Sequence, residues 1–374
     1  MRLLEASSMD IAARKLRDFY DHQPGAAIVQ EEFGFFTESW KRQGHIGDRT
    51  DLHALFGLDR RAVHGAANLG WCEAALCPAF EEGVLEDRGD YELVRDFAGR
   101  TLLCFKGRRS GFMPEYLDHP IKDEASLDAF AFRLDPDSPE RYIGLEARCT
   151  DLLRHAEEGD WIQQRVIGGY MYLRSLIGPE RLLFTFYDDP ALIHRCMELW
   201  LNLADKVTAR WQERICFDEV FLAEDICYNG GCLISPDMMK EFLFPYYQQL
   251  LENIKRRRGS GKRPLVVQVD TDGNCLPVID LYREQIGMNY MSPFEAASGC
   301  DVVAVRKKYP DLLIRGGFDK RILAAGKEAI RQEVERVMPF MVREGGYIPS
   351  CDHGVPDEVA FDDYLYYREL MREY

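Results

Sequence analysis

The sequence has no apolar run long enough to cross a lipid bilayer. A membrane-spanning helix needs about 18 or more consecutive apolar residues, and the apolar runs of this chain are far shorter. Residues 1–10 include the acidic Glu5 and Asp10 and lack the continuous apolar core of a secretory signal. We therefore expect no membrane partner and a cytoplasmic protein.

Positive charge is also scarce. The chain has 47 Lys and Arg against 63 Asp and Glu, which leaves a formal net charge of -16. Nucleic acids and anionic membranes would repel such a chain before contact, so neither is an expected partner. The 11 cysteines are odd in number and form no Cys-x-x-Cys pair, which favours reduced thiols over a disulfide framework. The absence of a P-loop, a dinucleotide fingerprint, Gly-x-Ser-x-Gly and His-Glu-x-x-His leaves nucleotide-dependent and serine-hydrolase chemistry without support.

What the chain does contain is a series of short apolar runs that end in acidic or polar residues. Helical patterns separate these runs, which cover residues 218–225, 264–272, 288–295, 312–319 and 347–353. Buried strands of a parallel sheet have this form, because helices cover both faces of the sheet. The expected fold class is α/β, a (β/α)8 TIM barrel. About seven strands are visible in the sequence, and closure of the barrel requires an eighth.

The whole chain, residues 1–374, is predicted to be a single barrel domain with two additions. Residues 1–25 form an N-terminal extension with an amphipathic helix from Ile11 to Tyr20. The first barrel strand is then expected over residues 26–33. An insertion over residues 70–135 has two β-rich runs joined by a Gly turn, which predicts an antiparallel hairpin covering the barrel mouth.

The polar residues at the predicted strand ends form one candidate site. In a (β/α)8 barrel, catalytic groups lie at the C-terminal ends of the strands. The residues expected at this rim are Glu31, Glu224, Asp225, Gln268, Asp270, Asp272, Glu295, Asp319, Asp352 and His353. Because clustered anions repel one another, function explains their gathering at one rim better than stability does.

The segment Asp270-Thr-Asp-Gly-Asn274 is the sharpest motif. In a strand, Asp270 and Asp272 point to the same face, so two carboxylates would crowd together. Such crowding raises the pKa of one carboxyl for acid/base work or creates a cation site. The segment is not an EF-hand loop, whose Gly stands at the sixth position. The alternative is that one Asp caps the following helix.

Other side chains near this rim suit proton transfer or substrate binding. His353 is a proton carrier or a metal ligand tuned by Asp352, unless its role is structural. Tyr170 and Phe294 would supply apolar walls, unless they belong to the core. The cations expected near the rim are Arg108, Arg109, Arg174, Arg315 and Arg321. Each would orient a substrate carboxylate or pair with a site Asp.

Several segments resemble the uroporphyrinogen decarboxylase superfamily. They lie at residues 111–123, 223–225 (Ala-Glu-Asp), 234–242, 245–247 (Pro-Tyr-Tyr), 315–320 (Arg-Gly-Gly-Phe-Asp-Lys) and 346–356. The resemblance covers nearly the whole chain and implies a (β/α)8 barrel. It also implies one of two activities: decarboxylation of tetrapyrrole acetate arms without a cofactor, or zinc-dependent methyl transfer with a corrinoid. The decarboxylases resemble one another in an N-terminal Met-Arg-Gln-Ala-Gly-Arg segment, which has no counterpart before Glu31.

The methyltransferase branch carries His-x-Cys where this chain has Asp270-Thr-Asp272, and a later Cys near the position of His353. The resemblance therefore implies a divalent metal at Asp270, Asp272 and His353, with Cys351 in place of His353 if the alignment shifts. Carboxylate and imidazole ligands are harder than thiolates, so the site suits Zn, Mn, Fe or Mg. A site without metal is the alternative.

We therefore expect a uroporphyrinogen decarboxylase-like enzyme that transfers or removes a methyl group of a small organic substrate. The predicted catalytic residues are Asp270, Asp272, His353, Glu224 and Asp225. The predicted substrate-binding residues are Glu31, Tyr170, Arg174, Gln268, Phe294, Glu295 and Asp319. A corrinoid supplied by a partner protein and a homodimer are further expectations. The alternatives are a cofactor-independent decarboxylase and a non-catalytic protein that binds a corrinoid or tetrapyrrole.

Overall fold

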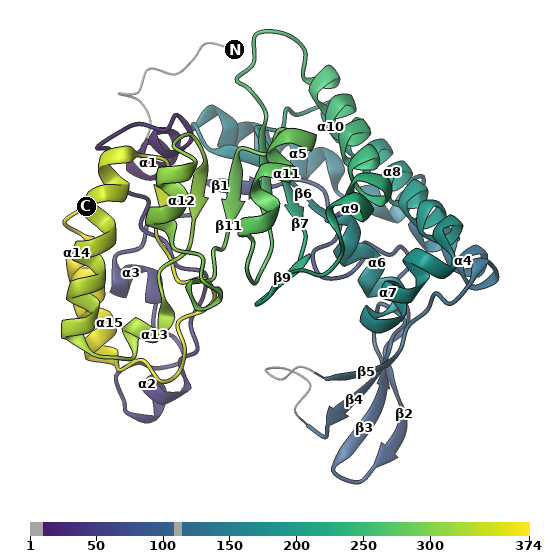
Figure 1. Cartoon of the computed structure of the whole chain (residues 1–374), viewed down its shortest axis with the longest axis horizontal. Coiled ribbons are helices and arrows are strands. Elements are labelled where there is room, and N and C mark those ends of the chain that lie inside the picture. Colours follow the sequence, from purple (N-terminus) through teal and green to yellow (C-terminus); the bar gives the residue numbers. More distant parts are fainter. Residues whose placement is uncertain (1–9, 108–113) are drawn as a thin grey trace.

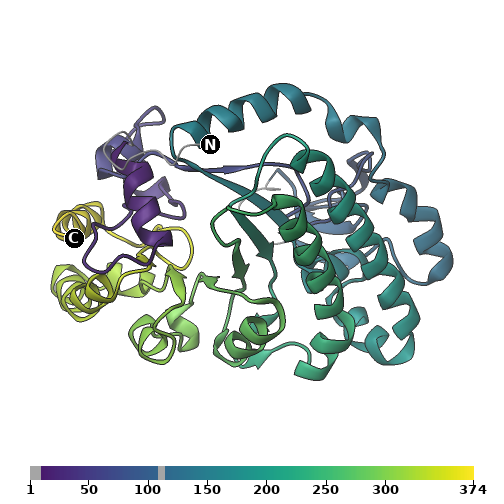
Figure 2. The same ribbon diagram turned by 90° about the horizontal axis from the view of Figure 1, so that it is seen from above.

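The computed structural model describes residues 10–107 and 114–374. Its centre is a parallel sheet of seven strands in the order β1-β6-β7-β10-β11-β12-β13. The strands are β1 (Val63–Gly65), β6 (Trp161–Ile167), β7 (Glu219–Ala223), β10 (Val266–Asp270), β11 (Tyr290–Ser292), β12 (Leu313–Arg315) and β13 (Tyr347–Ile348). The sheet curls inside an outer layer of helices (Figure 1, Figure 2). Nearly every residue of β6 and β7 is buried, as expected for strands covered on both faces.

Helices follow most of these strands. The longer ones are α5 (Leu145–Glu157), α7 (Pro179–Asp188), α8 (Pro190–Gln212), α10 (Phe244–Arg258), α14 (Lys327–Glu344) and α15 (Phe361–Met371). The shorter ones are α2 (Glu38–Arg42), α3 (Leu52–Phe56), α4 (Glu124–Phe130), α6 (Gly169–Ile177), α9 (Pro236–Phe242), α11 (Ile279–Ile286), α12 (Val302–Lys308) and α13 (Lys320–Leu323). No helix within the described ranges is both long and apolar enough to span a membrane.

The predicted N-terminal helix is confirmed as α1 (Ile11–Tyr20), and it closes one end of the sheet. Leu16 and Phe19 of α1 are buried in one apolar cluster with residues at the N-terminal ends of the strands. They are Ala62, directly before β1, the first strand residues Trp161, Val266, Tyr290 and Leu313, and Ile348 of the short strand β13. Burial of this apolar surface away from water fixes α1 as the floor of the sheet.

The strand predicted over residues 26–33 is wrong, and the described residues do not form an eight-stranded barrel. The segment is extended, but its backbone groups bond to partners outside any ladder. The N–H of Ile28 donates to the Tyr374 carbonyl at 3.2 Å, and the N–H of Gln30 donates to the Asp59 carboxylate at 2.7 Å. The curled sheet therefore has seven hydrogen-bonded strands, and this segment lies against its cavity without joining it.

The insertion contains the predicted hairpin as part of a larger antiparallel sheet. Its strands, in spatial order, are β2 (Gly83–Arg88), β3 (Tyr91–Arg95), β4 (Thr101–Phe105) and β5 (Glu115–Asp118). The hairpin pairs β3 with β4 and projects with its sheet from the body of the molecule (Figure 1). A two-stranded ribbon of β8 (Cys227–Tyr228) and β9 (Gly231–Cys232) follows β7.

Candidate functional site

The curled sheet and α1 enclose a cavity of about 350 Å³. Its apolar lining includes Leu16, Val29, Trp71, Phe221, Tyr290 and Ile348. Its polar lining includes Glu31, Glu32, Gln163, Arg165, Gln268, Asp270, Ser292, Arg315, Ser350 and Asp352. The cavity thus extends from the floor helix to the predicted rim, where several of the expected site residues lie.

Asp270 is the last residue of β10 and lies at the rim end of this cavity. Its carboxylate accepts a hydrogen bond from the hydroxyl of Ser292, the last residue of β11. The amide of Gln268 donates to the same hydroxyl oxygen at 2.9 Å. Burial raises the pKa of Asp270 to about 6, and the negative charge of Asp272 adds to the shift. Asp270 therefore titrates close to neutral pH.

His353 follows β13 and faces carboxylates from three parts of the chain. Its Nε2 lies 3.4 Å from Asp272 Oδ2, and its Nδ1 lies 3.6 Å from Glu295 Oε1 and 3.5 Å from Asp352 Oδ1. The Lys320 ammonium lies 2.9 Å from Asp352 Oδ1 and 3.5 Å from His353 Nδ1. We name Asp272, Glu295, Lys320, Asp352 and His353 the His353 cluster. The interaction with Asp272, followed by that with Asp352, raises the pKa of His353 to about 10, so the ring is cationic at neutral pH.

The donor atoms of this cluster fit a divalent metal. Glu295, Asp352 and His353 offer ligand atoms that all lie within 4.8 Å of one another. Two ligands about 2.1 Å from one ion at a tetrahedral angle are roughly 3.4 Å apart, close to the separations around His353. An ion would have to displace the imidazole proton and the Lys320 ammonium, which makes its binding pH-dependent.

The predicted metal set is brought together only in part. Asp272 contacts His353, whereas Asp270 bonds to Ser292. Glu295 and Asp352 take the positions around the other ring nitrogen of His353. Glu295 is also fixed in place, because its Oε2 accepts hydrogen bonds from the Gly273 N–H at 2.8 Å and the Ser298 hydroxyl at 3.1 Å.

Glu224 lies apart from the cavity lining, in a buried hydrogen-bond network. Its Oε1 accepts from the N–H groups of Tyr170 and Met171 at 2.9 and 3.3 Å, in the first turn of α6. Its Oε2 accepts from the hydroxyls of Tyr247 and, at 3.2 Å, Tyr282. Burial raises the pKa of Glu224 to about 7. The geometry makes this side chain a connection between α6, α10 and α11.

Two other predicted carboxylates form ion pairs with arginines. Asp225, which has a φ of 118°, lies 2.6 Å from Arg174 Nη2. Burial raises the pKa of Asp225, while Arg174 opposes the shift. Glu31 lies in the cavity lining with its Oε1 2.5 Å from Arg315 Nε. The arginines of this rim were expected either to orient a substrate carboxylate or to pair with a site acid. The structure shows Arg174 and Arg315 in the second role, as ion-pair partners.

The remaining predicted residues are structural in their contacts. Tyr170 and Phe294 are almost fully buried, and burial raises the pKa of Tyr170 to about 12. Asp319 caps α13 and pairs with Arg321 at 2.7 Å. Arg108 and Arg109, with the first part of the segment 111–123, lie outside the described residues.

Sequence analysis missed Arg165, Trp71 and Lys320. Arg165 is the only ionisable residue of β6, and the other residues of this strand are buried. A charge inside such a strand is costly unless it faces a polar space, so this residue could have been predicted to face the cavity. Trp71 and Lys320 carried no comparable signal, because their positions depend on loops.

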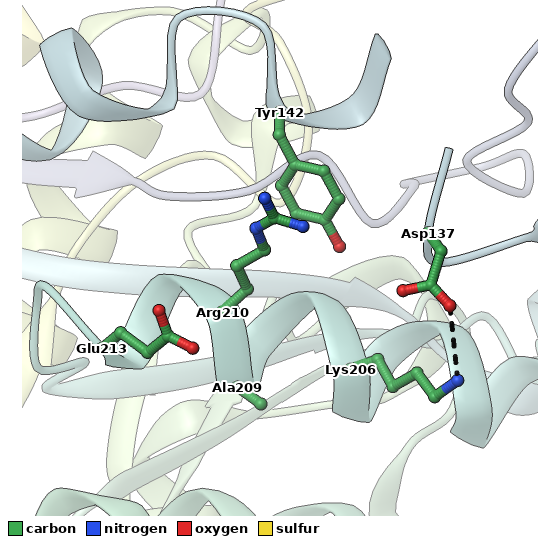
Figure 3. A pocket seen from close by; sticks show the side chains of 6 residues that line it. All are labelled: Asp137, Tyr142, Lys206, Ala209, Arg210 and Glu213. Carbon is green, nitrogen blue, oxygen red and sulfur yellow. Dashed lines mark ion pairs between the residues drawn. The ribbon is translucent and has the colours of Figure 1, made fainter. Parts of the chain in front are cut away.

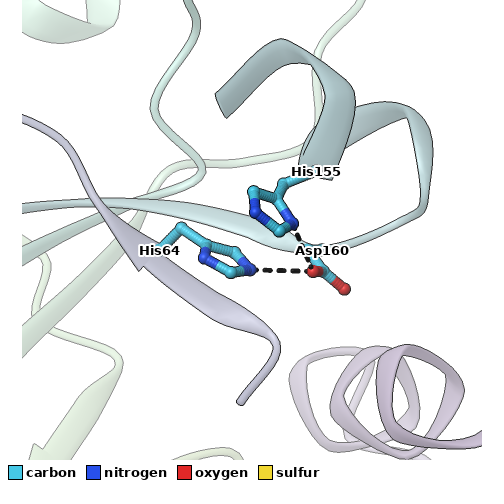
Figure 4. A group of neighbouring side chains, drawn as sticks. All are labelled: His64, His155 and Asp160. Atoms are coloured by element: carbon cyan, nitrogen blue, oxygen red, sulfur yellow. Dashed lines mark hydrogen bonds and ion pairs between the residues drawn. The ribbon is translucent and has the colours of Figure 1, made fainter. Parts of the chain in front are cut away.

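Two further features lie away from this cavity. Figure 3 shows a depression of about 440 Å³ beside α8, where Lys206 pairs with Asp137 at 3.6 Å. Figure 4 shows His64, His155 and Asp160, a second group with metal-ligand spacing. Arg60 already engages both oxygens of Asp160 at 2.8 and 2.9 Å, so this group has a structural explanation.

Comparisons with known proteins agree with this architecture. A uroporphyrinogen decarboxylase from Pseudomonas savastanoi pv. phaseolicola is 26% identical over 175 residues, 46% of this chain and 46% of that protein. One from Alcanivorax borkumensis is 27% identical over 183 residues, again 46% of each. The aligned part thus spans about half the length of these relatives. A methyltransferase from Methanosarcina mazei superposes with a TM-score of 0.57 and 14% identity, covering 97% of this chain and 98% of that one, which shows a common fold.

The family assignment rests on the larger part of the chain. Residues 116–374, which include every strand from β6 to β13 and the whole His353 cluster, match the family described as uroporphyrinogen decarboxylase (URO-D). This chain belongs to the uroporphyrinogen decarboxylase family.

Proposed function

We propose that this protein is a URO-D-like enzyme that transfers or removes a methyl group of a small organic substrate bound in the central cavity. The observation that carries the proposal is the His353 cluster, whose Asp352 also lines the cavity. Two of its members, Asp272 and His353, are at positions where the resemblance to the methyltransferase branch implies metal ligands. The methyltransferase that superposes on this chain supports the same choice.

The chemistry of the cluster supports a metal with oxygen and nitrogen ligands. In the proposal, Nδ1 of His353 holds the ion together with Glu295 and Asp352, while Asp272 bonds to the other ring nitrogen and orients the imidazole. A bound divalent cation would act as a Lewis acid on a substrate oxygen. Asp270, with its pKa of about 6, would exchange a proton with the substrate beside it. Glu224 would act indirectly by holding α6.

The size and charge of the cavity favour a small substrate. Its volume of about 350 Å³ is at the low end of the range of about 300–1,000 Å³ for small-molecule pockets. Its lining mixes the carboxylates Glu31, Asp270 and Asp352 with arginines, so it lacks the uniformly positive charge that a substrate with many negative charges would require. A tetrapyrrole with eight carboxylates therefore fits poorly. The corrinoid would be carried by a separate protein.

Decarboxylation without a cofactor is the second candidate, and one observation favours it. Asp270 is a half-buried carboxylate at the cavity rim, a position from which it would stabilise a cationic intermediate. The names of the curated relatives point the same way. This candidate predicts turnover in the presence of a chelator.

The experiment that separates the two candidates is metal analysis of the purified protein by mass spectrometry. We expect about one divalent metal per chain in the wild type, retained in His45→Ala and lost in His353→Ala, because His45 is exposed and lies outside the cavity lining. The same proteins are then assayed for demethylation of methylated small molecules with a reduced corrinoid as acceptor. A metal content unaffected by His353→Ala, or turnover that persists after chelation, would contradict the proposed metal site.

A further inference from the structure

We propose that the cavity binds a small, planar monocarboxylic acid, with the carboxylate paired to the guanidinium of Arg165. This inference rests on the proposed function only in taking the cavity as the substrate site. It adds a substrate class and a recognition residue that the family assignment does not supply.

Arg165 is held in the cavity wall by aromatic rings. Its guanidinium carbon lies 3.9 Å from the centre of the Trp71 ring and 5.3 Å from that of Phe221, and the two rings stack at 5.4 Å. Stacking fixes the plane of a guanidinium and leaves its N–H groups at the edge free to bind an acceptor. The side chain is therefore positioned before any ligand arrives.

No carboxylate pairs with Arg165 in the part of the chain that the structure describes. Its Nε is buried and has no hydrogen-bond partner among these residues. An unpaired buried donor is costly, so such a group is satisfied by water or a ligand. Burial lowers the pKa of Arg165 to about 10, which still leaves it cationic at neutral pH.

The acids of the cavity wall are already engaged. Glu31 pairs with Arg315 at 2.5 Å, Asp59 with Lys15 at 2.9 Å, and Asp352 with Lys320 at 2.9 Å. The carboxyl of Glu32 accepts hydrogen bonds from Cys351 N–H and the Tyr364 hydroxyl, and burial raises the pKa of Glu32 to about 7. Asp270 bonds to Ser292 and acts on Arg165 only through its charge, so no carboxylate of the wall forms an ion pair with Arg165 in the part of the chain that the structure describes.

A carboxylate suits this position better than a phosphate. A guanidinium and a carboxylate are both planar and form two parallel hydrogen bonds. A phosphate monoester carries about 1.5 to 2 negative charges at neutral pH, and the second charge would face Glu31, Asp270 and Asp352 in the same cavity. The wall therefore favours a ligand with a single negative charge.

The strand register sets the length of the ligand. Arg165 of β6 is aligned with Phe221 of β7, and Phe221 is aligned with Gln268 of β10. These three residues therefore lie in one layer across the sheet. Asp270 stands two residues further along β10, which is about 6.6 Å towards the rim. A para-substituted six-membered ring covers a rise of this size along the strand direction. An aromatic monocarboxylate bound to Arg165 would thus present its far end to Asp270 and the His353 cluster.

The test compares acids with their uncharged amides. Binding of benzoate and 4-methoxybenzoate, and of benzamide and 4-methoxybenzamide, is measured by calorimetry and by tryptophan fluorescence, in the presence of chelator and without turnover. A charged hydrogen-bonded pair contributes about 1.5–3 kcal/mol, so the wild type should bind each acid roughly 10- to 100-fold more tightly than its amide. Arg165→Met should abolish this preference, and Arg165→Lys should reduce it.

The control is Arg61→Met, which removes a second cation from the cavity lining. Arg61 is exposed and its Nε donates to the Val63 carbonyl at 2.9 Å, so this variant should keep the preference within about threefold. Equal binding of acid and amide by the wild type, no binding of either acid, or an unchanged preference in a folded Arg165→Met would overturn the inference. Acid binding without any methyl transfer would leave it standing and refute the proposed function instead.

Discussion

Replacement of Glu224 by alanine tests whether this residue acts on substrate or holds the fold. The variant removes one acceptor from four donors: the N–H groups of Tyr170 and Met171 and the hydroxyls of Tyr247 and Tyr282. All four donors lie in a buried environment, where an unsatisfied polar group costs about 1–3 kcal/mol. Because the losses share one network and partly relax, we expect a total of about 4–6 kcal/mol.

The expected shift in melting temperature follows from the size of the chain. An unfolding entropy of about 2.1 cal/mol/K per residue gives roughly 0.8 kcal/mol per degree for a chain of this length, so Glu224→Ala should melt about 5–8 °C below the wild type. Differential scanning calorimetry at one pH measures this shift. The control is Glu252→Ala, an exposed glutamate of α10, which should melt within about 1 °C of the wild type.

Glu224→Gln separates the structural role from a chemical one. The amide oxygen still accepts from the two N–H groups of α6, and the amide N–H₂ can donate to the hydroxyl oxygens of Tyr247 and Tyr282. We expect a loss of only about 1–2 kcal/mol and unchanged ligand binding in the cavity. An alanine variant as stable as the wild type would refute the structural argument, and a stable glutamine variant without turnover would return Glu224 to the catalytic set.

Three further predictions concern the floor and the rim of the cavity. Burial raises the pKa of Glu219 to about 7, so its protonated form favours folding. This contribution is full below pH 4.5 and lost as the pH rises through 7. In the wild type, ionisation of Glu219 should lower the free energy of unfolding by up to about 1.4 kcal/mol per pH unit, and Glu219→Gln should remove this dependence on pH. Urea titrations at several pH values measure the free energy of unfolding. Tyr20→Phe removes the hydroxyl that donates to Glu219 and should cost about 1–3 kcal/mol, more at pH 8 than at pH 5, in the same titrations. Gly316→Ala, with its Cβ 2.1 Å from the Pro293 carbonyl, should lose at least about 3 kcal/mol, whereas Gly326→Ala, equally left-handed but in open space, should lose about 1 kcal/mol; equal losses would refute the steric argument.

Local signals predicted the elements that depend on local physics. The predicted helix Ile11–Tyr20 follows from its periodicity, and the strand Trp161–Ile167 and the helix break near Pro245 have equally local causes in apolar content and the missing proline N–H. The cap at Ser235 is another local feature, because its side chain accepts from the Met238 N–H at 3.1 Å. These features need no knowledge of distant parts of the chain.

The structure differs from the sequence-based expectation where distant residues decide the geometry. The segment 26–33 has strand-like composition, but its partners include Tyr374, at the other end of the chain. Glu224 follows a strand as a rim residue would, and only the approach of Tyr247 and Tyr282 from two helices makes it a buried acceptor. The sequence predicted Asp270 and His353 at one rim of the sheet. In the structure Glu295, and not Asp270, lies beside His353, and this neighbour is decided by the geometry of the loops that follow the strands.

The segment 26–33 forms one wall of the cavity without backbone hydrogen bonds to the described strands of the central sheet. A hydrogen-bonded ladder transmits register from strand to strand, so moving one strand shears its neighbours. This segment is suspended instead from the Asp59 side chain and the Tyr374 carbonyl. Glu31 and Glu32, which it carries into the cavity lining, are joined to the rest of the molecule by side-chain contacts with Arg315 and the Cys351 N–H instead of by a ladder. The cavity thus combines a side built on backbone ladders, which bears Arg165 and Asp270, with a side whose position depends on individual side-chain contacts.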